Sequence, residues 1–153
     1  MSVENFEYLL FEVYHRQIYI DQYTKYCILR KEGVLSRAED LYARIDVLCG
    51  AGLISGEDAD TCRETVDMLL SEKEDVDEER SGIFITHLAM ALKRAQNGQT
   101  ETPIDAAVLE ELKEEPVYEK AAEFFDRMTE ILPEPLPDAE TGFIMVHLCN
   151  VLA

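Results

Sequence analysis

Apolar side chains recur every three or four residues through most of the chain, the spacing that places them on one face of an α-helix. One such stripe is formed by Cys62, Val66 and Leu69. Glycine and proline interrupt the pattern at intervals, as they do between helices. The pattern therefore predicts an all-helical bundle for residues 38–153, with helices over 36–48, 55 to about 70, 80 or 81 to 97, about 105–114, after Glu115-Pro116 to about 132, and 138–152.

Capping residues and breakers set the predicted helix ends. Ser55 and Asp138 stand where a side-chain oxygen can accept a hydrogen bond from an amide of the first helical turn. Asn97-Gly98 follows the third stripe and is typical of a helix C-terminus. The acidic run 72–79 has Val76 as its only apolar residue, so we expect a helix end followed by a solvated loop, with the third helix opened by Arg80 or Ser81.

The first 37 residues differ from the rest in charge and composition. They hold five acidic and five basic residues, and seven of the thirteen aromatic residues of the chain. Helical spacing favours a helix here, although residues 18–28 also have strand-like composition. We therefore expect an N-terminal aromatic extension over residues 1–37 and a domain over residues 38–153. The aromatic face of the extension either packs on its own domain or forms a dimer contact.

Because the extension is neutral, the whole net charge of −18 belongs to residues 38–153. Affinity for nucleic acids comes largely from Lys and Arg side chains that displace counterions from phosphates. So acidic a surface argues against direct DNA or RNA binding by the main body. It suits basic protein partners, or simply solubility.

Length and composition indicate one compact domain, since 153 residues with 47% hydrophobic content can bury a core. No apolar run approaches the roughly 18 residues of a membrane span, and the N-terminus lacks the pattern of a secretory signal. The cysteines have neither a CxxC pair nor metal-ligand spacing, so they are predicted to be reduced: Cys27, Cys49, Cys62 and Cys149. We expect a cytoplasmic protein without membrane contact.

Motifs for catalysis, cofactors and metals are not found. The acidic run from Asp75 to Glu79 hints at a calcium loop, but Arg80 stands where the tight turn requires glycine. There is no phosphate-cradling glycine loop, no HExxH motif, and no serine or cysteine in a nucleophile context. His87 and His147 have no second ligand three or four residues away. We therefore expect no metal, no cofactor, no catalytic residue and no enzyme activity.

Two histidines lie on the apolar sides of predicted helices. His87 stands between Ile83 and Ala91 at four-residue spacing, and His147 stands likewise in the last helix. Either alone would be interpreted as a core or boundary residue. An imidazole nitrogen is nevertheless a nucleophile near neutral pH, because its ordinary pKa is about 6.5. The third histidine, His15, is interpreted as an ordinary surface residue.

Both histidine segments resemble those of one protein family. Residues 86–98, Thr-His-Leu-Ala-Met-Ala-Leu-Lys-Arg-Ala-Gln-Asn-Gly, are similar to the first phosphorylatable histidine segment of the phosphotransferase-system regulation domain, or PRD. Residues 140–150, Glu-Thr-Gly-Phe-Ile-Met-Val-His-Leu-Cys-Asn, closely resemble the second. Residues 109–122 and 136–140 look like the middle and pre-terminal blocks of the family. The resemblance covers about residues 38–153 and is to a stand-alone, single-domain member.

The resemblance implies an all-α bundle of five main helices, two antiparallel pairs with a further helix packed across them. It also implies that His87 and His147 accept phosphate from the phosphocarrier protein, or from a sugar-specific B component, of the bacterial sugar phosphotransferase system. Lys93 and Arg94 follow the first histidine and are candidates to pair with the phosphate. Family members regulate transcription or carbohydrate uptake through protein contacts, and a homodimer is expected.

One departure from the family pattern leaves two functions open. The first histidine is commonly preceded by Asp, whereas Thr86 stands here. A missing carboxylate would leave His87 less well oriented and less basic, so His147 is expected to be the stronger acceptor. The alternative is an acidic helical adaptor or scaffold that keeps the bundle but is not phosphorylated. Phosphate acceptance requires both rings to lie on neighbouring helices, partly reachable from solvent.

Overall fold

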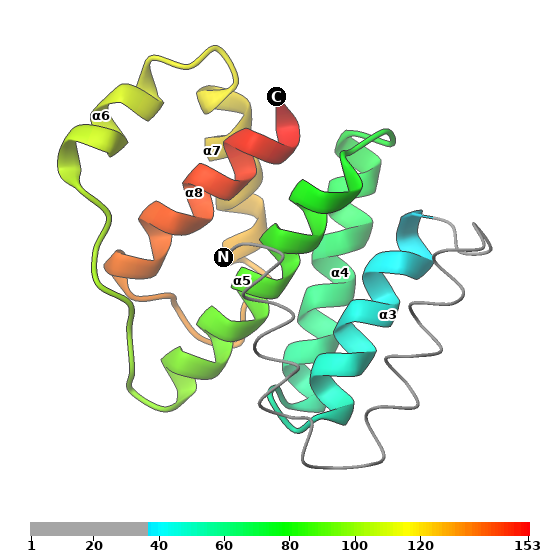
Figure 1. Cartoon of the computed structure of the whole chain (residues 1–153). Helices are drawn as coiled ribbons and strands as arrows, with labels where there is room; N and C mark the ends of the chain where they lie inside the picture. The colour runs from blue at the N-terminus through cyan, green and yellow to red at the C-terminus, as the bar shows by residue number, and fades with distance from the viewer. Residues whose placement is uncertain (1–36) are drawn as a thin grey trace.

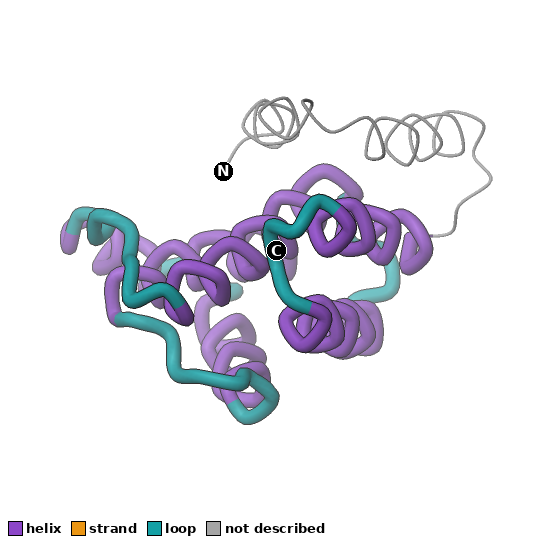
Figure 2. The backbone as a smooth tube through the Cα atoms, turned by 90° about the horizontal axis from the view of Figure 1, so that it is seen from below, coloured by secondary structure: helices purple, strands orange, loops and turns teal. Residues whose placement is uncertain are grey.

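The computed structural model describes residues 37–153, which contain α-helices and no strand (Figures 1 and 2). The all-helical prediction for residues 38–153 is confirmed. The described part of the chain has six helices, the number that the hydrophobic pattern predicts and one more than the five main helices that the family resemblance implies. Expectations for residues 1–36 lie outside the described residues. The helices are α3 (Arg37–Gly50), α4 (Gly56–Glu72), α5 (Glu78–Gln96), α6 (Ala106–Lys113), α7 (Tyr118–Thr129) and α8 (Asp138–Leu152).

The six helices form two groups that meet along α5 and α8. Helices α3, α4 and α5 pack against one another on one side of Figure 1, and α6 and α7 pack against α8 on the other. Helices α5 and α8 run antiparallel, because contacts that move back along α5 move forward along α8. Arg94 binds Glu140, the rings of His87 and His147 lie side by side in a tilted arrangement, and Arg80 reaches the carbonyl of Asn150.

Two helices end as the glycines predicted. After α3, the amide of Leu53 donates to the carbonyl of Leu48 at 3.0 Å, and Gly52 between them adopts φ +73°. After α5, the amide of Gln99 donates to Arg94 at 2.8 Å, and Gly98 adopts φ +66°. Each glycine occupies the left-handed position that closes a Schellman motif, which satisfies carbonyls at the helix end.

The helix starts differ from prediction at α5 and α8. Ser55 caps α4 as expected, by accepting from the amide of Asp58 at 3.1 Å. The predicted start of α5 at Arg80 or Ser81 is wrong, because Asp77 accepts from the amide of Arg80 at 2.8 Å and the helix begins at Glu78. Acidic residues suit a first helical turn because they face its positive dipole end. Asp138 is the first residue of α8 and does not cap it with its side chain.

One apolar core runs through both groups of helices. Its largest fully buried side chains include Phe84 of α5, Phe124 of α7 and Leu148 of α8. Val76, from the loop predicted to be solvated, is 0% exposed and belongs to this core. None of the helices within residues 37–153 is long and apolar enough to cross a membrane.

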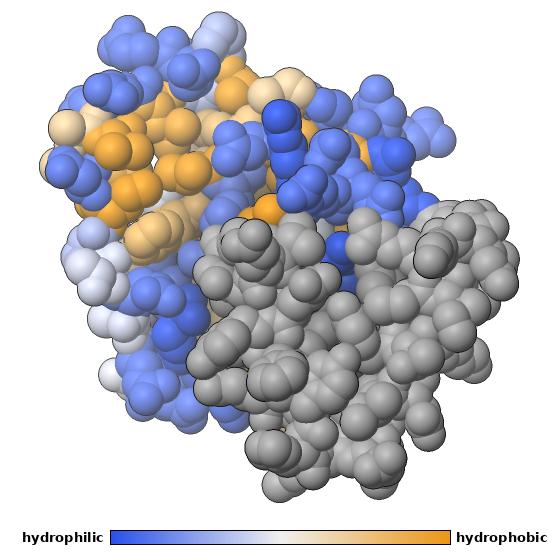
Figure 3. All heavy atoms as spheres, in the orientation of Figure 1, coloured by the Kyte–Doolittle hydropathy of each residue, from blue (hydrophilic) through white to orange (hydrophobic). Residues whose placement is uncertain are grey.

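Helix α6 is the least integrated of the six. None of its residues is buried, and Val108 on it is 42% exposed. Apolar side chains gather on the face over α6 and α8 (Figure 3). A cavity of about 350 Å³ lies there between Leu109 and Leu112 of α6 and Met145 of α8. This helix therefore borders an apolar groove instead of filling the core.

Candidate functional site: a histidine pair between α5 and α8

The structure brings the two predicted histidines together. His87 projects from α5 and His147 from α8, with ring centroids 4.8 Å apart and ring planes inclined by 48°. Phe143, one turn before His147, lies 5.6 Å from the His87 ring. Arg80 closes one end of this contact, where its Nη1 donates to the carbonyl of Asn150 at 3.3 Å. We call the contact line the α5–α8 seam, formed by Arg80, His87, Arg94, Glu140, His147 and Asn150.

The two rings differ in their access to solvent. His147 is half-buried, as expected for a residue that a phosphodonor must reach. The expectation of solvent access is wrong for His87, which is 5% exposed. Its Nε2 atom is fully buried. The two rings thus lie side by side with different exposure, and only His147 keeps appreciable access to solvent.

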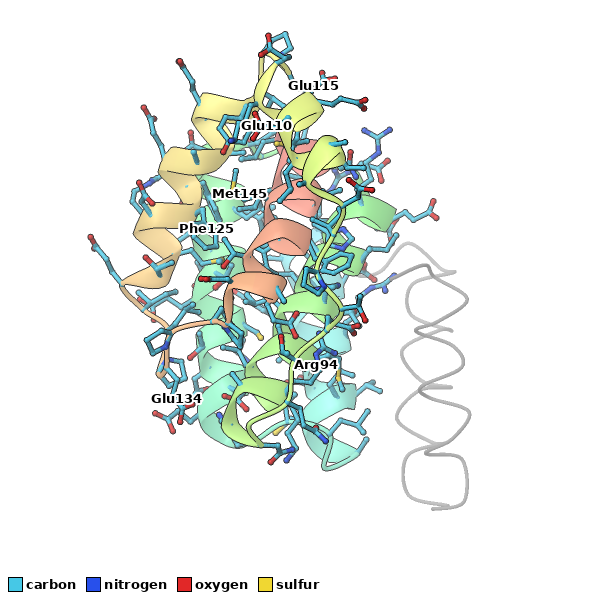
Figure 4. All side chains as sticks on the ribbon, turned by 90° about the vertical axis from the view of Figure 1, so that its left-hand side faces the viewer. Arg94, Glu110, Glu115, Phe125, Glu134 and Met145 are labelled. Atoms are coloured by element: carbon cyan, nitrogen blue, oxygen red, sulfur yellow. The ribbon has the colours of Figure 1, made fainter. Side chains whose placement is uncertain are left out.

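A buried carboxylate closes the other end of the seam. Glu140, in the first turn of α8, is 0% exposed. Arg94 donates two hydrogen bonds to it, from Nε to Oε1 at 2.6 Å and from Nη2 to Oε2 at 3.0 Å. Oε2 also lies 3.5 Å from Nε2 of His87. Figure 4 shows Arg94 near the C-terminal end of α5, at the level where α8 begins. The site thus contains two imidazoles, one carboxylate and one guanidinium.

Burial and the Arg94 charge set the protonation of these groups. Burial alone would raise the pKa of Glu140, but the hydrogen bonds and positive charge of Arg94 hold that pKa below its ordinary value. Burial lowers the pKa of His87 to about 4, against the opposing pull of Glu140. Burial, with the neighbouring His87, lowers the pKa of His147 to about 3. At neutral pH both rings are therefore uncharged and keep a nucleophilic lone pair.

Comparison with known proteins identifies this fold. A family model described as PRD domain matches residues 67–151. The chain belongs to the PRD domain family. The matched region begins near the end of α4 and includes all of the α5–α8 seam. No curated protein and no solved structure gives a significant match. PRD domains are regulatory domains connected with the phosphotransferase system, so membership places this chain in a regulatory class, not a catalytic one.

Sequence reasoning missed the role of Glu140 in this PRD domain. Thr86 does not leave His87 without a carboxylate, because Glu140 of α8 lies 3.5 Å from its Nε2. Thr86 itself is buried, and its hydroxyl finds no partner among the described residues. The sequence does contain a signal for this contact, in the spacing of the residues involved. Arg94 follows His87 by seven residues, and Glu140 precedes His147 by seven. In an antiparallel helix pair two such spacings bring both ends together.

The two basic residues predicted to pair with phosphate are placed differently. Arg94 points into the seam, where it binds Glu140 and also lies 3.3 Å from Glu101 through Nη1. Lys93 is half-buried and forms no ion pair within residues 37–153. A role in phosphate binding remains a prediction for both. In the same part of the chain, no group of three or more His, Cys, Asp or Glu side chains is placed to hold a metal ion.

Proposed function

We propose that this PRD domain is a phosphorylation-responsive regulator of the bacterial sugar phosphotransferase system, with His87 and His147 as phosphate acceptors. The observation that carries the proposal is the direct contact of the two tilted rings, with centroids 4.8 Å apart, inside the region matched by the PRD family. The donor is the phosphocarrier protein or a sugar-specific B component. The domain acts in the cytoplasm through protein–protein contacts, as a homodimer, on transcription or carbohydrate uptake.

The chemistry of the seam supports phosphate acceptance. A neutral imidazole has the lone pair that attacks phosphorus, and burial keeps both rings neutral at pH 7. His147 is the more accessible of the two and is expected to take up phosphate faster. A protein donor must approach a chain of net charge −18, so contact through a basic surface of the donor is favoured.

A phosphoryl group would change the balance of charge in the seam. It adds about −1.5 to −2 charge at neutral pH. Glu140 already lies 3.5 Å from His87, so a phosphate there meets a like charge. Arg94 is the cation closest to both, and its 18% exposed side chain can turn from Glu140 towards the phosphate. Because that hydrogen-bonded pair joins α5 to α8, its rearrangement alters the contact between the two groups of helices.

The adaptor function remains the alternative because His87 is only 5% exposed. A histidine buried beside a carboxylate can serve packing alone. In that case the acidic surface of the bundle would bind its partner without any modification. The two functions differ in one measurable property, the ability of the histidines to take up phosphate.

Labelling with phosphoenolpyruvate, enzyme I and the phosphocarrier, with and without a sugar-specific B component, tests the proposal. Acid-labile phosphate is expected on His147 and His87. His87→Ala and His147→Ala should each remove their own share, and the double variant should remove all of it. His15→Ala is the matched control and should leave the label unchanged. A parent protein that no donor labels, or a double variant that labels like the parent, would establish the adaptor function instead.

A further inference from the structure

The two nitrogens of His87 are not equivalent in the seam. Nε2 is fully buried and faces the carboxylate of Glu140, with 3.5 Å between Nε2 and Oε2. Nδ1 lies on the opposite edge of the imidazole. Whatever exposure His87 retains therefore excludes Nε2. A phosphodonor that reaches this ring has to approach from the Nδ1 edge.

The environment of Glu140 fixes where the imidazole proton resides. Its side chain is 0% exposed and is held by two hydrogen bonds from Arg94, so the carboxylate is ionised and can only accept hydrogen bonds. A neutral imidazole beside such an acceptor places its N–H towards it. The other nitrogen then carries the lone pair, which is how a partner on one side of a histidine selects the tautomer.

We propose that His87 accepts phosphate on Nδ1, and that Glu140 is the positioning residue that imposes this choice by holding the Nε2 proton. The inference rests on the proposed function and specifies the acceptor atom. Glu140 does not touch phosphorus; it acts through the His87 ring.

The step balances without any further reactant. The Nδ1 lone pair forms the new N–P bond while the N–P bond of the phosphorylated donor histidine breaks. The bonding electrons return to the donor nitrogen, and Nε2 of His87 keeps its proton. The phosphorylated ring then carries positive charge, which Glu140 offsets. The 3.5 Å separation is long for a hydrogen bond, and it should shorten once the ring carries positive charge as well as the carboxylate its negative charge.

His147 provides an internal contrast. Within residues 37–153, no carboxylate lies within ion-pair distance of its ring, and the ring beside it is the uncharged imidazole of His87. Nothing among these residues selects one of its nitrogens in the way Glu140 selects for His87. The two acceptors of the same chain should therefore differ in the phosphohistidine isomer they form.

Isomer analysis of the labelled protein tests the acceptor atom. The full chain and its His147→Ala variant are labelled with phosphoenolpyruvate, enzyme I and the phosphocarrier, then digested and probed with isomer-specific antibodies. The phosphate at His87 should be 1-phosphohistidine, the Nδ1 isomer. Finding 3-phosphohistidine at His87 overturns the inference while leaving the proposed function intact. An absence of label in every protein overturns the proposed function itself.

Glu140→Gln tests the positioning role, because an amide can either accept from or donate to Nε2. We expect a mixture of isomers at His87 and at least a tenfold slower labelling of His87. Glu101→Gln is the matched control, since Glu101 also lies near Arg94 but does not contact the histidine. It should keep the parental isomer and rate. Equal behaviour of the two variants would overturn the positioning role.

A measurement that needs no phosphodonor separates positioning from folding. In the unlabelled protein at pH 7, ¹⁵N chemical shifts of the His87 ring should report a protonated Nε2 and an unprotonated Nδ1. In folded Glu140→Gln, as judged by circular dichroism, that preference should be reduced. A parental ring with its proton on Nδ1 would overturn the proposal, whatever the labelling result.

Discussion

Helix α5 is flanked by two ion pairs, and they differ in what surrounds them. On one side Arg44 and Asp40 lie one turn apart on α3, 3.9 Å from Nε to Oδ2, with side chains 3% and 4% exposed. On the other side Arg94 binds Glu140 across two helices, with side chains 18% and 0% exposed. The first pair is sealed in the packing. The second keeps a guanidinium with access to solvent and to Glu101, so it can exchange partners.

The sealed pair also shapes the backbone beside it. Gly82 of α5 lies against Arg44, and a Cβ there would come within 2.7 Å of the guanidinium carbon. A side chain at this position would therefore have to displace the Arg44 guanidinium, whereas the φ of Gly82 itself is not in the left-handed region. The two pairs beside α5 therefore differ in exposure, since both members of the first are buried whereas Arg94 of the second is partly exposed.

Removing the carboxylate from each ion pair should show the difference between the two pairs most clearly. Asp40→Ala leaves a buried guanidinium without this partner and should lower the free energy of unfolding by about 3–5 kcal/mol. Glu140→Gln should lower it by only about 1–2 kcal/mol, because Arg94 still reaches Glu101 and water. Urea unfolding followed by circular dichroism measures both. Equal losses, or a larger loss for Glu140→Gln, would contradict the distinction between a sealed and an exchangeable pair.

Acid should weaken the seam. The folded pKa values of His87 and His147, about 4 and about 3, lie below the ordinary 6.5. Below pH 6.5 the two histidines therefore bind protons in the unfolded chain but not in the folded chain. The free energy of unfolding falls as pH decreases towards 4. We expect a loss of about 2 kcal/mol between pH 7 and pH 5, at about 1.4 kcal/mol per pKa unit and discounted for the partial exposure of His147.

Difference measurements isolate this effect from the general charge of an acidic chain. The double variant His87→Gln, His147→Gln should lose most of the pH 7 to pH 5 dependence. Asp40→Asn should keep it, because no histidine lies in the sealed pair. Unfolding curves at both pH values give the comparison. Parallel pH profiles for the parent and the double variant would show that these histidines are not held neutral by the fold.

The close approach at Gly82 gives the smallest effect. Gly82→Ala forces the Arg44 guanidinium to shift inside a packed environment, which should lower the unfolding free energy by about 1–3 kcal/mol. Gly56→Ala is the control, since a Cβ at Gly56 meets nothing within 4 Å. That variant should change stability by less than about 0.5 kcal/mol. Thermal unfolding of the two variants is sufficient, and equal midpoints would mean that Arg44 moves without cost.

Local sequence signals predicted the helices well. The stripe with Cys62 and Val66, the cap at Ser55 and the ending at Gly98 all depend on residues a few positions apart. The start of α5 was missed because its acidic run looked solvated, although Asp77 is an N-cap and Val76 is buried. Composition alone could not distinguish a charged loop from the charged first turn of a helix.

The candidate site was predictable only in part. His87 and His147 follow from helical spacing and from the family resemblance, and their roles as acceptors remain predictions. The pairing of Arg94 with Glu140 joins residues 46 positions apart, so it depends on the antiparallel register of α5 and α8. Burial of His87 likewise depends on what packs over the middle of α5. Neither property is encoded in any short stretch of the chain.

The histidines lie where the two groups of helices meet. Helices α3–α5 form one group and α6–α8 the other, and the contact of α5 with α8 is the most extensive between them. Any rotation about this contact would move the far ends of α3 and α6 through a longer arc than it moves either imidazole. Such a rotation converts a small displacement at the seam into a larger one at the outer helices. A rotation caused by a charge in the seam would therefore be largest at the parts of the described surface that lie furthest from it.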